Sequence, residues 1–133
     1  MGLPKTIQPD PSPARVAQAG LRTFFRIAGL WRLSVEEQIT LLGSPGRSTY
    51  YKWKKEGADA LPRDVLERLS YVLGIYKALQ VLLPDERAAD AWVRRPNSAR
   101  PFGGRSALDR MLSGQVADLY EVRRYLDAER GGW

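Results

Sequence analysis

The sequence predicts an all-α protein made of two helical parts. Apolar residues recur at spacings of three and four along most of the chain, which is the period of an amphipathic helix. Ser residues followed three positions later by Glu or Asp mark helix starts, and Gly residues mark helix ends. A chain of 133 residues can bury roughly two-thirds of its unfolded surface. Such a length suits one domain or two very small ones, and we expect residues 14–83 and 84–133 to form a larger and a smaller helical part.

The composition excludes several kinds of chemistry. The chain has no Cys and no His, so it lacks disulfides, thiol chemistry and the commonest general base and metal ligand. The adjacent Glu36 and Glu37 point in different directions on a helix. We therefore expect no enzyme, no cofactor and no metal site. Residues 1–13 contain no apolar run of the length of a signal peptide or spanning helix, so we expect a cytoplasmic protein without a membrane partner.

The positive charge is concentrated in the first part of the chain. Residues 1–83 hold 12 Lys and Arg against 7 Asp and Glu, a net charge of +5, and residues 84–133 hold 9 against 8, a net charge of +1. Three of the five lysines are Lys52, Lys54 and Lys55. This concentration predicts one surface that attracts a polyanion.

The first helix is expected to follow a flexible arm. We predict the arm for residues 1–13, because residues 1–11 contain three prolines and little to bury. Ser12 is placed to cap a helix, and Pro13 suits its first position. One helical face then carries Leu21, Phe24, Phe25 and Ala28. This spacing predicts a core helix that is interrupted near Gly29.

A second helix and a short third helix are predicted after it. Ser34 and Glu37 match a capping box, and Gly43 is placed to end the second helix. Ile39 and Leu42 are expected to form its buried stripe. In the third helix Tyr50 and Trp53 lie three residues apart and are expected to face inward. The outward residues are then Arg47, Ser48, Thr49, Tyr51 and Lys52, followed by Lys54 and Lys55.

This order of helix, glycine turn and helix resembles a helix-turn-helix of the Xre or transposase-like kind. The second helix of such a motif enters the major groove of double-stranded DNA. The resemblance makes Arg47 the best candidate for a bidentate guanine contact, with Ser48, Thr49, Tyr51 and Lys52 beside it. Lys54 and Lys55 are expected to contact the DNA backbone. The alternative is that a short basic surface helix only keeps the protein soluble.

The longest helical pattern covers residues 61–83. Its apolar residues recur at spacings of 4, 3, 4, 3 and 4, at Val65, Leu69, Val72, Tyr76, Leu79 and Leu83. More apolar residues widen this seam, at Leu66, Leu73, Ile75 and Leu82. Such a helix is either the central helix of the domain or a core helix that also pairs with a second subunit. A homodimer is favoured, because a helix-turn-helix half-site usually needs a two-fold partner. We therefore assign residues 14–83 to a DNA-binding and dimerisation domain.

Residues 84–133 are predicted to form the second helical domain. A helix begins at Asp85, packs through Ala88, Ala91 and Trp92, and ends before Pro96. Ser106 and Asp109 match another capping box, with Leu108, Met111 and Leu112 on one face and Gly114 after them. The last amphipathic helix carries Val116, Leu119, Val122 and Leu126.

Short elements of this part occur in an order that resembles the toxin-binding domain of the Xre/MbcA/ParS antitoxins. They are Pro96-Asn97, Gly103-Gly104-Arg105-Ser106, residues 108–112 and Gly114. The sequence departs from the family pattern in a longer segment at residues 98–102 and in Ala107, where Pro is common. The resemblance implies an antitoxin of a type II toxin-antitoxin system. Its partner would be a RES-domain toxin, which consumes NAD or uses it to ADP-ribosylate a target. The antitoxin would occlude the toxin's active site and repress its own operon.

The end of the chain is the expected inhibitory contact. Trp133 follows Gly131 and Gly132, so a large ring and a free carboxylate lie on a flexible hinge that suits a concave site. With Arg130, this tail is expected to enter or cover the toxin's NAD pocket. The alternative is a disordered tail. Further anchors are expected at Arg105, Arg123 and Arg124, because Arg and Trp dominate binding hot spots.

Two other functions fit the same sequence. One is a helix-turn-helix transcriptional regulator without a toxin, in which the C-terminal part serves only dimerisation. The other is an antitoxin that binds its toxin but no longer binds DNA.

Overall fold

A computed structural model describes residues 12–131, and every regular element in that part of the chain is a helix. This confirms the predicted all-α fold. In chain order the helices are α1 (Pro13–Leu30), α2 (Val35–Leu41), α3 (Arg47–Glu56), α4 (Arg63–Leu82), α5 (Glu86–Ala91), the 3-10 turn η1 (Trp92–Arg94), α6 (Ala107–Met111) and α7 (Val116–Glu129). None of the helices in residues 12–131 is long and apolar enough to cross a membrane.

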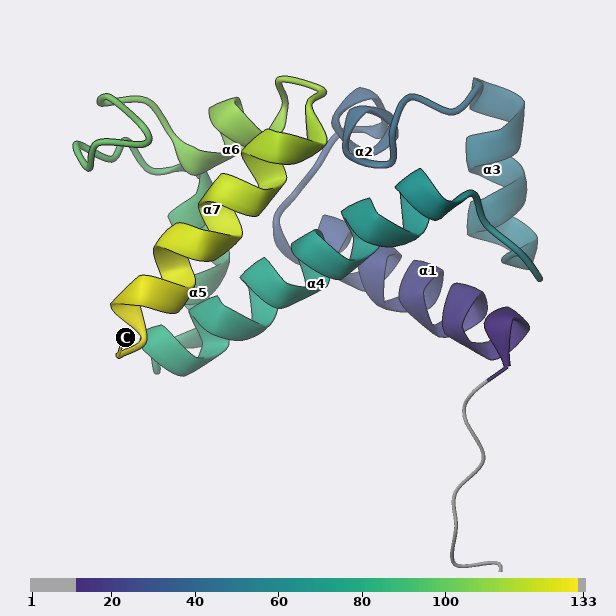
Figure 1. Cartoon of the computed structure of the whole chain (residues 1–133), viewed down its shortest axis with the longest axis horizontal. Coiled ribbons are helices and arrows are strands. Elements are labelled where there is room, and N and C mark those ends of the chain that lie inside the picture. The colour runs from purple at the N-terminus through teal and green to yellow at the C-terminus, as the bar shows by residue number, and fades with distance from the viewer. Residues whose placement is uncertain (1–11, 132–133) are drawn as a thin grey trace, which may run out of the picture.

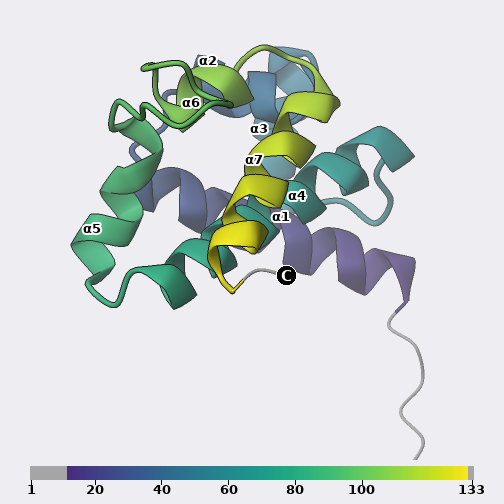
Figure 2. The ribbon, with the colours of Figure 1, turned by 60° about the vertical axis from the view of Figure 1, so that its left-hand side comes forward.

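Helix α4 is the centre of the fold. It runs between α1 and α7 and contacts both, and α5 folds back against its C-terminal half (Figure 1). Figure 2 shows the same order from the side, with α7 crossing in front of α4. The seam residues Val65, Leu69, Val72 and Leu79 are buried in the protein's own core. Both interpretations of α4 require this burial, and pairing of the same helix with a second subunit stays a prediction. The N-terminal and C-terminal parts share one continuous core.

Helix α1 begins as the sequence predicts. The Ser12 hydroxyl accepts a hydrogen bond from the Arg15 backbone N–H at 3.2 Å, and Pro13 is the first helical residue. Leu21, Phe24 and Ala28 are buried, and Phe25 is partly buried. The helix ends at Leu30, after which Trp31 turns into the core with 1% of its surface exposed.

The predicted stripe of α2 is partly wrong. Leu42 is fully buried, but Ile39 is only partly buried, and Leu41 and Gln38 face the core. Gln38 is held inward by its hydrogen bonds to Tyr50 of α3 and to the Leu33 carbonyl, so the buried face of α2 is wider than one apolar stripe. The capping box is confirmed: the Ser34 hydroxyl accepts from the Glu37 N–H at 3.0 Å, and the Glu37 carboxylate accepts from the Ser34 N–H at 2.8 Å.

The C-terminal part packs on α4 through α7, which buries Leu119, Val122 and Leu126. The second capping box is also confirmed, since the Ser106 hydroxyl accepts from the Asp109 N–H at 3.0 Å. The face predicted for the helix after Pro84 is partly wrong: Trp92 packs against the core and Ala88 is partly buried, but Ala91 is exposed. Ala89 and Val93, four residues apart, are fully buried instead, because η1 continues the same face.

Candidate functional site

Helix α3 presents the predicted DNA-contacting side chains to solvent. Tyr50 is fully buried and Trp53 is partly buried, as the spacing predicts. All seven predicted contact residues are exposed: Arg47, Ser48, Thr49, Tyr51, Lys52, Lys54 and Lys55. The structure therefore brings them together on the outer side of one helix, at one end of the molecule's long axis (Figure 1).

A buried polar chain fixes α3 against α2. The Tyr50 hydroxyl donates to the Gln38 side-chain oxygen at 2.6 Å, and the Gln38 amide nitrogen donates to the Leu33 carbonyl at 3.0 Å. Burial raises the pKa of the Tyr50 phenol above its ordinary value, with a smaller contribution from Tyr51. Tyr50 is therefore a neutral hydrogen-bond donor near neutral pH. Sequence analysis missed Gln38, because a Gln between Glu37 and Ile39 gives no sign that it faces inward.

The charges on the α3 surface differ in their contacts. Arg47 forms an ion pair with Glu36 of α2, and both side chains are largely exposed. Within residues 12–131, the side chains of Lys52, Lys54 and Lys55 form no ion pair or hydrogen bond with the protein. The three lysines are thus free to meet a polyanion.

In the C-terminal part, two of the sequence elements close a loop. The Asn97 N–H donates to the Arg105 carbonyl at 3.0 Å, and the Gly104 N–H donates to the Asn97 carbonyl at 2.8 Å. Gly103 and Gly104 have φ of 58° and 91°, a left-handed conformation that favours glycine. The Pro96-Asn97 and Gly103-to-Ser106 elements, which the sequence shows only in order, therefore lie side by side.

The closed loop places an aromatic cluster beside α7. Phe102 is 5% exposed, and its ring meets those of Trp92 and Tyr125 at centroid distances of 5.9 and 5.1 Å, both edge-on. Trp92 and Tyr125 also stack at 6.3 Å and remain partly exposed. The loop therefore anchors itself on the last helix through Phe102.

Three arginines bond to backbone carbonyls within the C-terminal part or between it and the N-terminal part, and sequence analysis missed all three roles. Arg94 donates to the Trp31 carbonyl at 3.1 Å and to the Arg32 carbonyl at 2.7 Å. Arg110 donates to the Pro101 carbonyl at 2.6 Å and pairs with Asp118 at 2.9 Å. Arg68 of α4 pairs with Asp64 at 2.9 Å and donates to the Gly114 carbonyl at 2.9 Å. No spacing in the sequence identifies a carbonyl partner, so these roles depend on the fold.

The predicted toxin-contacting arginines are divided between two places. Arg105 lies on the closed loop with 77% of its side chain exposed, 3.6 Å from Asp109. Arg123, Arg124 and Arg130 lie on α7 and at its end, and each is within 3.9 Å of an acidic residue of that helix. No ion pair or hydrogen bond in residues 12–131 joins Arg105 to these three.

The three α7-side arginines also differ in exposure. The Arg123 side chain is 34% exposed, and it lies over Gly74 of α4, where an added Cβ would stand 1.8 Å from its Nη1. Arg124 is 68% exposed and therefore the freest of the three. Gly131 is exposed with φ of 122°. Gly132 and Trp133 lie outside the described residues.

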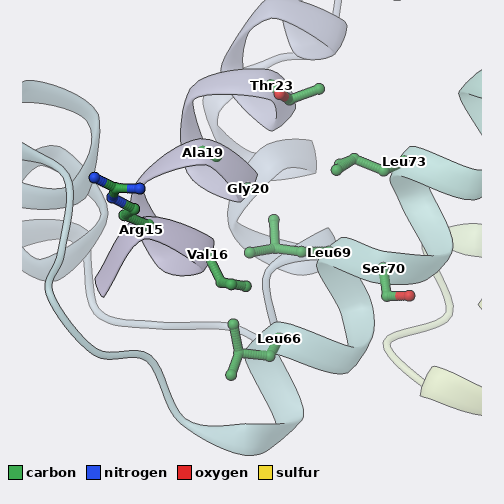
Figure 3. Close-up of a pocket in the computed structure, with 9 residues that line it drawn as sticks. All are labelled: Arg15, Val16, Ala19, Gly20, Thr23, Leu66, Leu69, Ser70 and Leu73. Atoms are coloured by element: carbon green, nitrogen blue, oxygen red, sulfur yellow. The ribbon is translucent and has the colours of Figure 1, made fainter. Parts of the chain in front are cut away.

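An apolar groove of about 470 Å³ lies between the N-terminal halves of α1 and α4. Figure 3 shows Val16 of α1 and Leu66, Leu69 and Leu73 of α4 projecting into it. Val16 is 46% exposed, whereas Leu69 is 3% exposed and forms the floor. Neither this groove nor any other part of residues 12–131 holds a group of three or more acidic residues that could bind a metal ion.

These features define a class of protein: a basic helix-turn-helix joined through a shared core to a helical region with exposed arginines. Residues 10–74 match the antitoxin Xre-like helix-turn-helix domain, and residues 78–132 match the antitoxin Xre/MbcA/ParS C-terminal toxin-binding domain. The chain therefore belongs to the Xre/MbcA/ParS family of antitoxins. These two domains imply a toxin partner and DNA binding. The chain is also 59% identical over 124 residues, 93% of each chain, to the uncharacterised protein y4oB of Sinorhizobium fredii (strain NBRC 101917 / NGR234).

Proposed function

We propose that this antitoxin neutralises a RES-domain toxin, which consumes NAD or ADP-ribosylates a target, by covering the toxin's active site. We also propose that it represses its own operon by binding operator DNA through α3. The observation that carries the proposal is the separation of the basic surface of α3 from the C-terminal loop that bears the exposed Arg105. Helix α3 and the loop that bears Arg105 lie at opposite ends of the long axis (Figure 1). Each surface can therefore bind its own partner.

The proposed DNA contact depends on electrostatics and on Arg47. Lys52, Lys54 and Lys55 neutralise phosphates, and Arg47 reads a guanine in the major groove. If a dimer contacts about eight phosphates, its affinity falls by roughly 10³ to 10⁵ between 50 and 200 mM salt. A flat response to salt would contradict the DNA role.

A gel shift with the DNA upstream of the reading frame tests this contact. Arg47→Ala and Lys52→Ala each weaken binding relative to the wild-type protein. The matched control is Lys77→Ala, because Lys77 is an exposed lysine on α4, outside the DNA-binding surface. Equal binding by all four proteins would exclude α3 as the DNA-binding helix and favour an antitoxin that binds only its toxin.

The proposed toxin contact works by occlusion and not by catalysis. Residues 131–133, with Arg130, enter or cover the NAD pocket, and Arg105, Arg123 and Arg124 anchor the surrounding interface. A stable complex of this kind buries about 1,600 Å² or more. The exposure of Arg105 and Arg124 supports this assignment, since their guanidinium groups can leave weak pairs for a partner.

Co-expression with a neighbouring RES-type reading frame tests the toxin contact. The wild-type chain restores growth, and a chain that lacks residues 131–133 does not. Unimpaired rescue by the shortened chain would place the inhibitory contact elsewhere. Absence of any complex with the neighbouring gene product, measured by pull-down and mass determination, would favour a regulator without a toxin.

We also propose a homodimer that forms through the apolar groove of α1 and α4. The seam of α4 is already used in the core, and the groove is an exposed apolar surface on the DNA-binding half. Val16→Glu puts a charge into the groove and lowers the mass measured by analytical ultracentrifugation. Val81→Glu is the control, because Val81 is 57% exposed on the other end of α4. A monomeric wild-type protein would exclude the dimer.

A further inference from the structure

We propose that Glu36 of α2 is a specificity-determining residue of the DNA-binding surface. It positions the Arg47 guanidinium for one base and weakens binding to other sequences. This inference rests on the proposed DNA binding by α3. Its basis is the ion pair that joins the first turn of α2 to the first residue of α3.

The Glu36 carboxylate has a small structural role, because it lies in the first turn of α2, where the helix dipole favours a negative charge. That role does not require its pair with Arg47. The capping box of α2 uses Glu37, and Glu36 lies outside it. Within residues 12–131 the Glu36 carboxylate forms a hydrogen bond and an ion pair with Arg47 and with no other side chain. Their side chains are 70% and 58% exposed, and exposed ion pairs contribute little to stability. The ion pair of Glu36 with Arg47 therefore adds little to the stability of the fold.

The pair matters more for recognition. An arginine side chain loses rotamer freedom when it binds, and a partner that already holds it reduces that loss. Arg has a planar fork of N–H donors, of which one bonds to Glu36. The remaining donors can meet the O6 and N7 acceptors of guanine. Glu36 therefore favours one direction of the Arg47 guanidinium before DNA binds.

The negative charge of Glu36 also opposes binding without a base match. It lies beside the surface that faces DNA, where it repels phosphates and reduces the local positive potential. On the correct sequence, the Arg47 contact with guanine offsets this repulsion. On other sequences the phosphates are repelled in the same way, but Arg47 makes no contact with a guanine. The repulsion itself lowers the affinity for every sequence alike, so the higher ratio of specific to non-specific affinity comes from the positioning of Arg47.

Selection from a library of random DNA duplexes tests the proposal. The wild-type protein enriches a guanine at one position of the site, and Glu36→Gln enriches it weakly or not at all. Affinities are then measured at one salt concentration for the selected duplex and for a scrambled duplex. We expect Glu36→Gln to bind the scrambled duplex more tightly and to lose about tenfold in the affinity ratio, within the range of one bidentate base contact.

Glu56→Gln is the matched control. Glu56 is the last residue of α3, is exposed, and has no ion-pair partner within residues 12–131. Its replacement removes the same charge from the same helix-turn-helix, so it tightens binding to both duplexes and leaves the ratio unchanged. An unchanged ratio for Glu36→Gln as well would overturn the proposal. A wild-type protein that enriches no sequence would overturn the proposed operator binding, and this inference with it.

A double-mutant cycle shows whether Glu36 acts through Arg47. In the Arg47→Ala background, Glu36→Gln is expected to leave the affinity ratio unchanged, because no guanidinium remains to be positioned. An equal loss in both backgrounds would mean that Glu36 contacts DNA directly, which contradicts a positioning role. Thermal unfolding of Glu36→Gln close to that of the wild type shows that the loss does not come from unfolding.

Discussion

The basic residues of α3 and those of the C-terminal part are in opposite situations. The lysines of α3 point into solvent without a partner in the described chain, whereas six of the nine arginines in residues 84–133 make ion pairs or bond to carbonyls. Lysine carries a hydrated point charge, and arginine has a planar fork that holds several acceptors at once. The positive charge of α3 is therefore left free for a polyanion, whereas most of the positive charge of the C-terminal part already has a partner within the protein.

The largest effect is expected when the free lysines are removed. Lys52→Gln, Lys54→Gln and Lys55→Gln together remove three phosphate contacts from each half-site and so about six from the dimer, and the slope of log affinity against log salt falls by about 5.4. Near physiological salt this lowers the DNA affinity of the dimer by about 10⁴-fold, or about 5.5 kcal/mol. Fluorescence anisotropy over a salt series measures both values.

The same triple variant is expected to keep the stability of the wild type. Gln has nearly the helix propensity of Lys, and the three side chains have no partner to lose. An unfolding midpoint in urea that drops clearly would mean that these lysines also build the fold.

The next effect concerns Arg68, which joins α4 to the C-terminal part. Its side chain is only 11% exposed, and it holds both Asp64 and the Gly114 carbonyl. Arg68→Met leaves that carbonyl without its donor, so the free energy of unfolding should fall by about 2 kcal/mol. Urea unfolding followed by circular dichroism measures the change. Arg63→Met, at an exposed position of the same helix, should change it by less than about 0.5 kcal/mol. Equal values for the two variants would refute the role of Arg68.

A smaller effect on stability is expected at Arg94, where a Lys keeps the positive charge but removes the planar guanidinium group. Arg94→Lys cannot reach the Trp31 and Arg32 carbonyls and Glu37 together. Because the Arg94 side chain is 43% exposed, water replaces part of the lost hydrogen bonds. We therefore expect the free energy of unfolding to fall by about 1 kcal/mol. Arg95→Lys is the control, since Arg95 is exposed. If both variants unfold like the wild type, the positive charge at position 94 is enough for stability, and the several hydrogen bonds of the Arg94 guanidinium are not needed.

The sequence predicts the long helices better than the short ones, for a physical reason. In α1 and α4 many apolar residues repeat one period, so an error at one position does not change the assignment. In α5 the face is defined by a few alanines, and the observed stripe is Ala89 and Val93 and not Ala91. Gln38 and Arg68 are buried because of partners distant in sequence, at Tyr50 and Gly114. Such contacts have no periodic sign in the sequence.

The candidate site follows the same rule. The exposure of the α3 residues could be predicted, because the inward positions of Tyr50 and Trp53 determine the rest of that helix. The ion pair of Arg47 with Glu36 could not, since it joins two helices across a turn. The pairing of Pro96 with Ser106 likewise depends on how the loop between them closes.

The smallest effect on stability is expected at the exposed arginines of the C-terminal part. Arg105 and Arg124 are 77% and 68% exposed, and their pairs with Asp109 and Glu121 measure 3.6 and 3.9 Å. Arg105→Gln and Arg124→Gln together should change the free energy of unfolding by less than about 0.5 kcal/mol, because exposed pairs are screened by water and salt. The same variant should bind the toxin more weakly in calorimetry, since these guanidinium groups can move to a partner. A loss of stability as large as that of Arg94→Lys would place them among the arginines that build the fold, and the C-terminal part would then have to bind its partner through other residues.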